Sequence, residues 1–172
     1  KMFSQNSHSP LILIVDDEVN IRGALVTLLE KKGYQVRGAG TGEEALEQLA
    51  AAAADLVLTD LKMPGIGGIE FIRRLKAKWP DTEVVVMTAY GSIDTAVEAM
   101  RHGAYDYLTK PVDRERFPVV VEKALELVHV VDQDREQVAA ALVAEPLQVE
   151  VLDVAPRLEA ELVLHRLGEV SP

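Results

Sequence analysis

The chain has 172 residues, 48% of them hydrophobic and 27% charged, so it can bury one core of ordinary size. It contains no cysteine, which excludes disulfides and thiolate metal sites and leads us to expect a cytoplasmic location. The net charge of −10 repels phosphate backbones, and the apolar runs are far shorter than the roughly 20 residues of a membrane span, so we expect neither nucleic acid nor a membrane as a direct partner.

Five short runs rich in leucine and β-branched residues alternate with segments of helical period. The expected strands are residues 11–15, 34–39, 55–60, 83–88 and 105–110. The expected helices between them are residues 19–32, 42–52, 68–78 and 93–102, three of them closed by Gly33, Trp79-Pro80 and Gly103. This alternation predicts an α/β fold, a doubly wound five-stranded parallel sheet with helices on both faces.

The sequence after the fifth strand predicts one long helix. Pro118 disfavours helical geometry at Phe117, so we expect the helix to start at Phe117 or Pro118 rather than at the earlier cap Asp113. A coiled-coil seam is indicated by apolar residues at spacings of three and four, namely Val120, Ala124, Leu127, Val131, Val138 and Ala141. We expect the helix to extend past the domain and pair with a second copy; a helix packed only on its own domain is the alternative.

These features divide the chain into four parts. Residues 1–9 are expected to be a disordered or artificially added start, because the chain begins with Lys1 rather than Met. Residues 10–129 are expected to form the folded domain. Residues 130–145 extend its last helix as a candidate coiled coil, and residues 146–172 form a short tail of unknown role.

Reactive side chains lie at the carboxyl ends of four expected strands. Asp16 and Asp17 follow the first strand, Asp60 ends the third, Thr88 ends the fourth and Lys110 ends the fifth. In an open parallel sheet these ends share one edge, where such folds bind ligands. Three carboxylates without histidine or cysteine favour a hard cation such as Mg²⁺. Together with a hydroxyl and an ammonium group, they suit phosphoryl binding, with Asp60 as the nucleophile and Asp16 and Asp17 at the metal.

The same residues carry a family resemblance. The pair Asp16-Asp17, "DLKMP" at 60–64, "MTA" at 87–89 and "YLTKP" at 107–111 resemble the receiver domain of bacterial two-component response regulators. The resemblance covers residues 10 to about 130 and implies a flavodoxin-like (βα)5 receiver fold. The segment "MTAYGSIDTAVEAM" and the long last helix are similar to receivers of sigma-54-dependent transcription activators, in which an AAA+ ATPase and a DNA-binding domain follow.

The resemblance implies a role for each acidic residue. Asp60 would accept a phosphoryl group from the phosphohistidine of a sensor histidine kinase. Mg²⁺ would lie on Asp17, on Asp60 and on the backbone carbonyl of Lys62, with Asp16 helping through water. These implied roles agree with the chemistry expected from the strand ends.

The resemblance also implies a switch. Thr88 and Lys110 would bind the phosphoryl oxygens, and Tyr107 would be the aromatic residue that turns inward as Thr88 moves toward the phosphate. Lys62 and Tyr90, two residues past Asp60 and Thr88, stand at positions that tune the lifetime of the phosphoryl group in this family.

The predicted function is therefore a phosphorylation-controlled signalling switch in transcription control, dimeric through its last helix, and not an enzyme with an external substrate. One alternative is a magnesium-dependent phosphatase with an aspartyl nucleophile, although Lys62 stands where such enzymes usually have a second acid. Another is a phosphorylation-independent interaction module. Because no ATPase phosphate loop occurs in the sequence, we expect either a truncated larger regulator or a natural short one.

Overall fold

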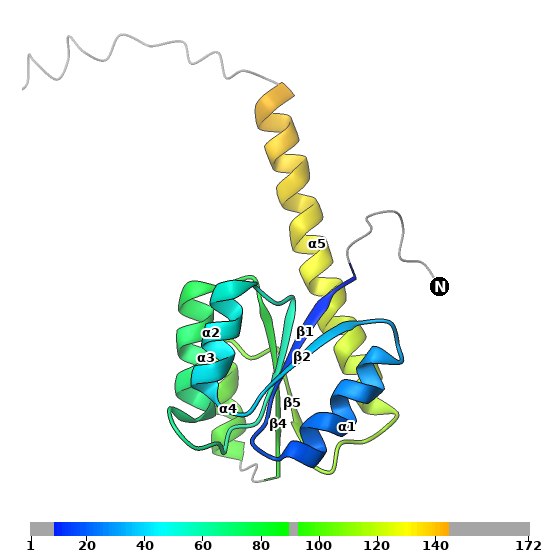
Figure 1. The fold of residues 1–172 in the computed structure, drawn as a ribbon. Helices are drawn as coiled ribbons and strands as arrows, with labels where there is room; N and C mark the ends of the chain where they lie inside the picture. The colour runs from blue at the N-terminus through cyan, green and yellow to red at the C-terminus, as the bar shows by residue number, and fades with distance from the viewer. Residues whose placement is uncertain (1–8, 90–92, 145–172) are drawn as a thin grey trace, which may run out of the picture. The chain divides into compact units, whose positions relative to one another are not determined.

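The computed structural model describes residues 9–89 and 93–144 (Figure 1). The strands are β1 (Leu11–Val15), β2 (Gln35–Ala39), β3 (Leu56–Thr59), β4 (Glu83–Thr88) and β5 (Asp106–Thr109). The helices are α1 (Val19–Glu30), α2 (Gly42–Ala51), α3 (Gly67–Lys78), α4 (Ile93–Arg101) and α5 (Arg116–Ala144). The expected tail at 146–172, almost all of the expected start at 1–9 and the candidate Tyr90 lie outside the described residues.

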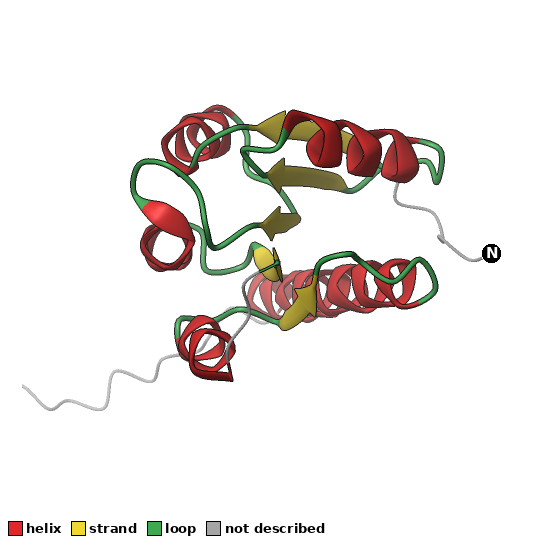
Figure 2. Ribbon diagram, turned by 90° about the horizontal axis from the view of Figure 1, so that it is seen from below, coloured by secondary structure: helices red, strands yellow, loops and turns green. Residues whose placement is uncertain are grey.

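All five strands are parallel and form one sheet in the order β2-β1-β3-β4-β5. This order reverses direction between β1 and β3, which is the switch point of a doubly wound sheet. The predicted fold class is confirmed, with element ends within two residues of those expected. Figure 2 shows the strands between two layers of helices.

The two faces of the sheet bury two separate hydrophobic clusters. In β1, Leu11, Leu13 and Val15 join the cluster under α2, α3 and α4, while Ile12 and Ile14 join the cluster under α1 and α5. All five side chains are buried, which explains why β1 reads as a continuous apolar run. Burial on both faces fixes the position of β1 and thereby of the acidic pair that follows it.

Two helices end at the glycines expected from the sequence. The chain leaves α1 through Gly33, at φ 91°, and leaves α4 through Gly103, at φ 98°. A positive φ is strained for residues with a side chain, so glycine is suited to these turns.

The start of α5 differs from the expected one. The helix begins at Arg116, and Asp113 caps it: Asp113 Oδ1 accepts hydrogen bonds from the backbone N–H groups of Glu115 (2.7 Å) and Arg116 (3.0 Å). The Asp113 carbonyl also accepts from Phe117 N–H (2.9 Å). The expectation that Pro118 would displace the cap was wrong, because the loss of one N–H near a helix start leaves the cap bonds of Asp113 intact.

The first part of the expected coiled-coil seam lies in the domain core. Val120 and Ala124 are buried against the α1 and α5 side of the sheet, whereas Leu127 and Val131 are 41% and 36% exposed. Any pairing along the seam therefore starts at Leu127. The side chains of the later seam positions, Val138 and Ala141, lie outside the described part of the structure.

The chain forms two compact units that divide between Gln133 and Asp134. In the second unit the structure describes only residues 134–144, which are helical. None of the described helices is both long and apolar enough to cross a membrane.

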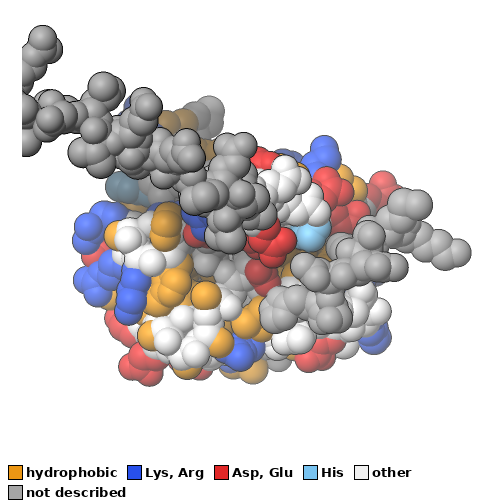
Figure 3. Space-filling view, turned by 90° about the horizontal axis from the view of Figure 1, so that it is seen from above, with side chains coloured by type: hydrophobic (Ala, Val, Ile, Leu, Met, Phe, Trp, Pro, Cys, Tyr) orange, Lys and Arg blue, Asp and Glu red, His pale blue; other side chains and the backbone are white. Residues whose placement is uncertain are grey.

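Basic residues gather on one helix although the chain is acidic overall. In α3, Arg73 and Arg74 form ion pairs with Glu70 at 2.7 and 2.6 Å, and the last turn carries Lys76 and Lys78. Figure 3 views the molecule from above and shows Lys and Arg side chains concentrated at one side of that face. The acidic residues Asp16, Asp17 and Asp60, by contrast, follow the carboxyl ends of β1 and β3.

Candidate phosphoryl and metal site

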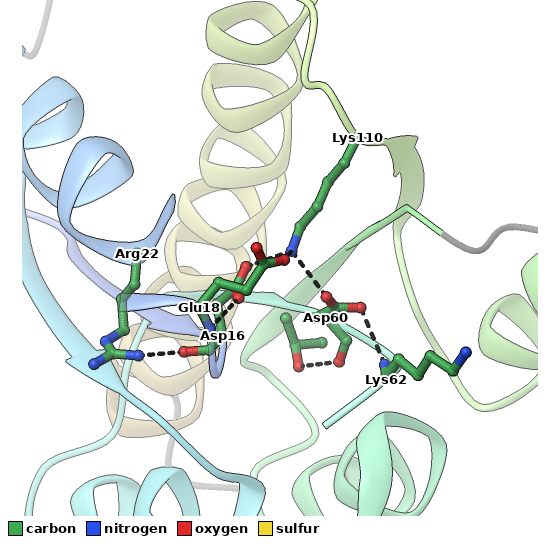
Figure 4. A network of polar contacts seen from close by, with 7 residues as sticks. Asp16, Glu18, Arg22, Asp60, Lys62 and Lys110 are labelled. Atoms are coloured by element: carbon green, nitrogen blue, oxygen red, sulfur yellow. Dashed lines mark hydrogen bonds and ion pairs between the residues drawn. The ribbon is translucent and has the colours of Figure 1, made fainter. Parts of the chain in front are cut away.

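Asp60 is the first residue after β3 and is almost fully buried, with 5% of its surface exposed. Its Oδ1 accepts a hydrogen bond from the backbone N–H of Lys62 (3.0 Å), and its Oδ2 accepts one from the Lys110 ammonium group (2.8 Å). Figure 4 shows both contacts. The carboxylate is therefore held in one orientation at the switch point of the sheet.

Lys110 joins two carboxylates from different strands. Its Nζ lies 2.6 Å from Asp16 Oδ2 and 2.8 Å from Asp60 Oδ2, with Glu18 Oε1 further away at 3.6 Å. Burial alone would lower the pKa of the ammonium group, but the hydrogen bonds to Asp16 and Asp60 outweigh it and raise the pKa above its usual value. Lys110 thus stays protonated and neutralises part of the acidic cluster.

The three aspartates come together as expected. Asp16, Asp17 and Asp60 each place a carboxylate oxygen within 4.8 Å of the others. Asp16 is fully buried, while Asp17 is exposed to solvent. An oxygen-only set of this size fits a hard divalent cation, and the exposed Asp17 side gives such an ion access to water.

The loop from β1 to α1 contains two contacts that the sequence did not reveal. Asp16 Oδ1 accepts from the backbone N–H of Glu18 (2.9 Å), and the guanidinium of Arg22 donates a hydrogen bond to the Asp16 carbonyl (Figure 4). Arg22 lies six residues after Asp16, a separation for which helical pairing rules, which concern residues three or four apart, give no signal. Both contacts hold Asp16 in place.

Thr88 and Tyr107 lie on the two neighbouring strands β4 and β5. Thr88 is buried at the end of β4, and its carbonyl accepts from Lys110 N–H (3.0 Å). Tyr107 pairs in register with Val86, and its ring packs against the cluster under α2, α3 and α4. The Tyr107 hydroxyl is buried and finds no hydrogen-bond partner within residues 9–89 and 93–144.

The fold and the cluster together define a class. A flavodoxin-like α/β domain with three carboxylates, a hydroxyl and a buried lysine at the carboxyl edge of its sheet can hold a divalent cation beside a carboxylate nucleophile. Such an arrangement suits phosphoryl binding beside a carboxylate.

Comparison with known proteins gives the family. Residues 12–122 match the response regulator receiver domain, and the chain belongs to this family of signalling domains. It is 42% identical over 130 residues to the transcriptional regulatory protein ZraR of Escherichia coli O157:H7, covering 76% of this chain and 30% of ZraR. It is 44% identical over 115 residues to the response regulator protein PilR of Pseudomonas aeruginosa, covering 67% of this chain and 26% of PilR.

Solved structures of receiver domains have the same fold as this chain. The receiver domain of NtrX from Brucella abortus is 38% identical with a TM-score of 0.64, covering 67% of this chain and 98% of that one. The beryllofluoride-activated NtrC4 receiver domain dimer is also 38% identical, with a TM-score of 0.66, covering 69% and 98%. The predicted resemblance to receiver domains is confirmed. The chain spans about 30% of the length of the curated ZraR relatives, so their full activities do not transfer to it directly.

Proposed function

We propose that this chain is the phosphoacceptor of a two-component phosphorelay and that Asp60 carries the phosphoryl group. The observation that supports this most is the placement of the Asp60 carboxylate, 2.8 Å from the Lys110 ammonium group and within 4.8 Å of Asp16 and Asp17. A buried carboxylate with a cation on one side and a site for a second cation on the other can accept a phosphoryl group, because the two cations stabilise its negative charge.

The proposed reaction transfers the phosphoryl group from a phosphohistidine of a sensor histidine kinase. A carboxylate oxygen of Asp60 attacks the phosphorus, the P–N bond to the imidazole breaks and an acyl phosphate forms; the imidazole nitrogen leaves with the electron pair. Asp16, Asp17, Asp60 and the Lys62 carbonyl would hold Mg²⁺, which neutralises charge on the phosphoryl oxygens when bound. The described donor set fits this ion.

The proposed switch uses Thr88 and Tyr107. A phosphoryl group on Asp60 adds negative charge and acceptor oxygens, which favours arrangements that bring the Thr88 hydroxyl and the Lys110 ammonium toward it. The Tyr107 hydroxyl is buried without a hydrogen-bond partner in the described residues. Because such a group is costly, a rotamer that gives it a partner becomes favourable when the end of β4 rearranges. Lys62, whose side chain is exposed beside the site, and Tyr90 are proposed to tune the lifetime of the phosphoryl group.

The proposed output is a change in dimerisation or partner binding that acts in transcription control, in the cytoplasm. The relative ZraR, named as a transcriptional regulatory protein, and the NtrC4 receiver dimer support this output. Within this chain, the exposed apolar residues Leu127, Val130 and Val131 on α5 are proposed to contact a second copy. We also propose that residues 10–129 form the receiver domain and that residues 130–145 extend its last helix as a coiled coil.

Intact mass after incubation with Mg²⁺ and acetyl phosphate tests the proposal, with Asp60→Asn run beside the parent. The parent should gain one phosphoryl group, and Asp60→Asn should gain none. Equal labelling of both proteins would reject Asp60 as the acceptor. Release of phosphate from varied external phosphoesters would instead support the phosphatase alternative.

A further inference from the structure

The loop that follows Asp60 forms a hydrogen bond with a residue in the first turn of α2. We call residues 60–66, between β3 and α3, the acceptor loop. Glu43, in the first turn of α2 after the N-cap Thr41, accepts a hydrogen bond at Oε1 from the backbone N–H of Ile66 (3.0 Å). The two residues are 23 positions apart in sequence, and α2 lies beside α3 in the fold (Figure 1).

Two glycines show how closely the parts fit. A Cβ atom placed on Gly65 would lie 2.4 Å from Glu43 Oε1, and Gly65 has φ 86°. A Cβ placed on Gly42, the residue before Glu43, would lie 2.9 Å from Cγ1 of Ile66. The acceptor loop therefore packs its backbone against the Glu43 carboxylate and its Ile66 side chain against the backbone of α2.

Backbone N–H groups also hold the start of the acceptor loop and join it to the first turn of α3. Gly68 N–H donates to the Leu61 carbonyl (2.9 Å), and Lys62 N–H donates to Asp60 Oδ1 (3.0 Å). Leu61, Met63 and Ile66 also pack against the hydrophobic cluster under α2, α3 and α4. Glu43 adds a hydrogen bond from a second element, α2, at the α3 end of the loop.

We infer that Glu43 is a positioning residue that sets the affinity of the site for Mg²⁺ by holding the acceptor loop and with it the Lys62 carbonyl. The inference rests on the proposed function, in which that carbonyl is a ligand. Groups that orient metal ligands without touching the metal typically change affinity by about 10- to 100-fold when removed. Because Glu43 is exposed and bonds through one oxygen, we expect the low end of this range.

The test compares Glu43→Ala with two matched proteins. Glu43→Gln loses the charge but keeps an oxygen that can accept from Ile66 N–H. Glu47→Ala makes the same chemical change one turn further along α2, where Glu47 is exposed and has no hydrogen bond or ion pair in the described structure. Calorimetric titration with MgCl₂ alone gives the affinity, and acetyl phosphate labelling at several Mg²⁺ concentrations gives the rate.

We expect Glu43→Ala to weaken Mg²⁺ binding roughly tenfold, Glu43→Gln to stay within about threefold of the parent, and Glu47→Ala to match the parent. The labelling rate of Glu43→Ala should recover at saturating Mg²⁺, since Asp60 itself is unchanged. Equal affinities for Glu43→Ala and Glu47→Ala would overturn the inference. So would equal losses in Glu43→Ala and Glu43→Gln, because the cause would then be charge and not the hydrogen bond.

A double-mutant cycle tests the contact without any phosphorylation. Gly65→Ala should destabilise the parent more than it destabilises Glu43→Ala, because the second protein lacks the carboxylate that the new Cβ would meet. Strictly additive losses would overturn the contact. Failure of the proposed function gives a different result: the parent itself would then bind no Mg²⁺ and take up no phosphoryl group.

Discussion

The Lys110 ammonium group lies 2.8 Å from Asp60 Oδ2, which joins the end of β5 to the end of β3 across the intervening strand β4. The two residues are 50 positions apart in sequence and both side chains are nearly buried, at 6% and 7% exposed. A charge pair in this setting stabilises only when both members are present, because an unpaired buried charge is costly. The stability of the domain therefore depends on whether Asp60 and Lys110 are both charged.

Lys110→Met should therefore destabilise the domain. The change leaves the carboxylates of Asp16 and Asp60 without their shared cation, and breaking a buried pair by removing one partner typically costs about 3–5 kcal/mol. Mg²⁺ should restore part of the loss, since it offers the same carboxylates a cation. Urea unfolding with and without MgCl₂ measures both effects; a deficit that Mg²⁺ does not reduce would argue against a metal site at these aspartates.

The raised pKa of Lys110 predicts a loss of stability in alkaline solution. Burial opposes protonation, but the hydrogen bonds to Asp16 and Asp60 outweigh it. Because the folded-state pKa lies above the unfolded value of about 10.4, the contribution of the charged lysine is fully present below that pH. It is lost as the pH rises through the folded-state pKa.

Tyr34 must be controlled for in this experiment. Burial, and then the charge of Glu122, raise its pKa as well, so ionisation of Tyr34 also weakens the fold at high pH. Unfolding free energies should be compared between Tyr34→Phe and Tyr34→Phe with Lys110→Gln, from about pH 8 upward. The difference should shrink above about pH 10.5; a difference that stays constant would contradict the ion-pair account.

Two neighbouring glycines at the start of α3 should respond differently to alanine. A Cβ on Gly68 would meet Leu61 Cα at 2.4 Å and the Asp60 carbonyl oxygen at 2.5 Å, whereas a Cβ on Gly67 has no atom within 4 Å. Gly67 has φ 70°, so Gly67→Ala should cost about 1–2 kcal/mol. Gly68→Ala should cost more than about 3 kcal/mol and should abolish labelling, because the backbone of the acceptor must shift. Similar melting temperatures for the two variants would contradict this geometry.

The exposed stripe on α5 predicts a site of self-association. Leu127 and Val131 are 41% and 36% exposed and stand four residues apart, on one face of the helix. Leu127→Glu with Val131→Glu should convert a dimer to a monomer in light scattering, because paired copies would then bury like charges. Val119→Glu, in the same helix at a residue 48% exposed, is the matched control and should keep the mass of the parent.

Much of the site could be predicted because strand ends are local features. β1 is buried on both faces and reads as an apolar run, so Asp16 and Asp17 follow a strand whose end is visible in the sequence. Asp60, Thr88 and Lys110 follow the same rule. The parallel order of the strands then brings these residues to one edge.

The contacts that support these residues could not be predicted. Glu43 bonds to Ile66 across 23 residues, and nothing in the composition of either segment indicates the pairing. At the start of α5, Pro118 and the capping carboxylate of Asp113 give opposing local signals, and the cap prevails. Long-range contacts and competition between local signals are decided by packing, which the sequence pattern does not display.

Mapping the labelled residue tests the central claim most directly. The parent would be incubated with Mg²⁺ and acetyl phosphate and then treated with borohydride, which reduces an acyl phosphate and converts that aspartate to homoserine. Peptide mass spectrometry should find the conversion at Asp60 alone, dependent on Mg²⁺. Conversion at Asp16 or Asp17 instead of Asp60, or no conversion in any peptide, would contradict the assignment of Asp60 as the phosphoacceptor.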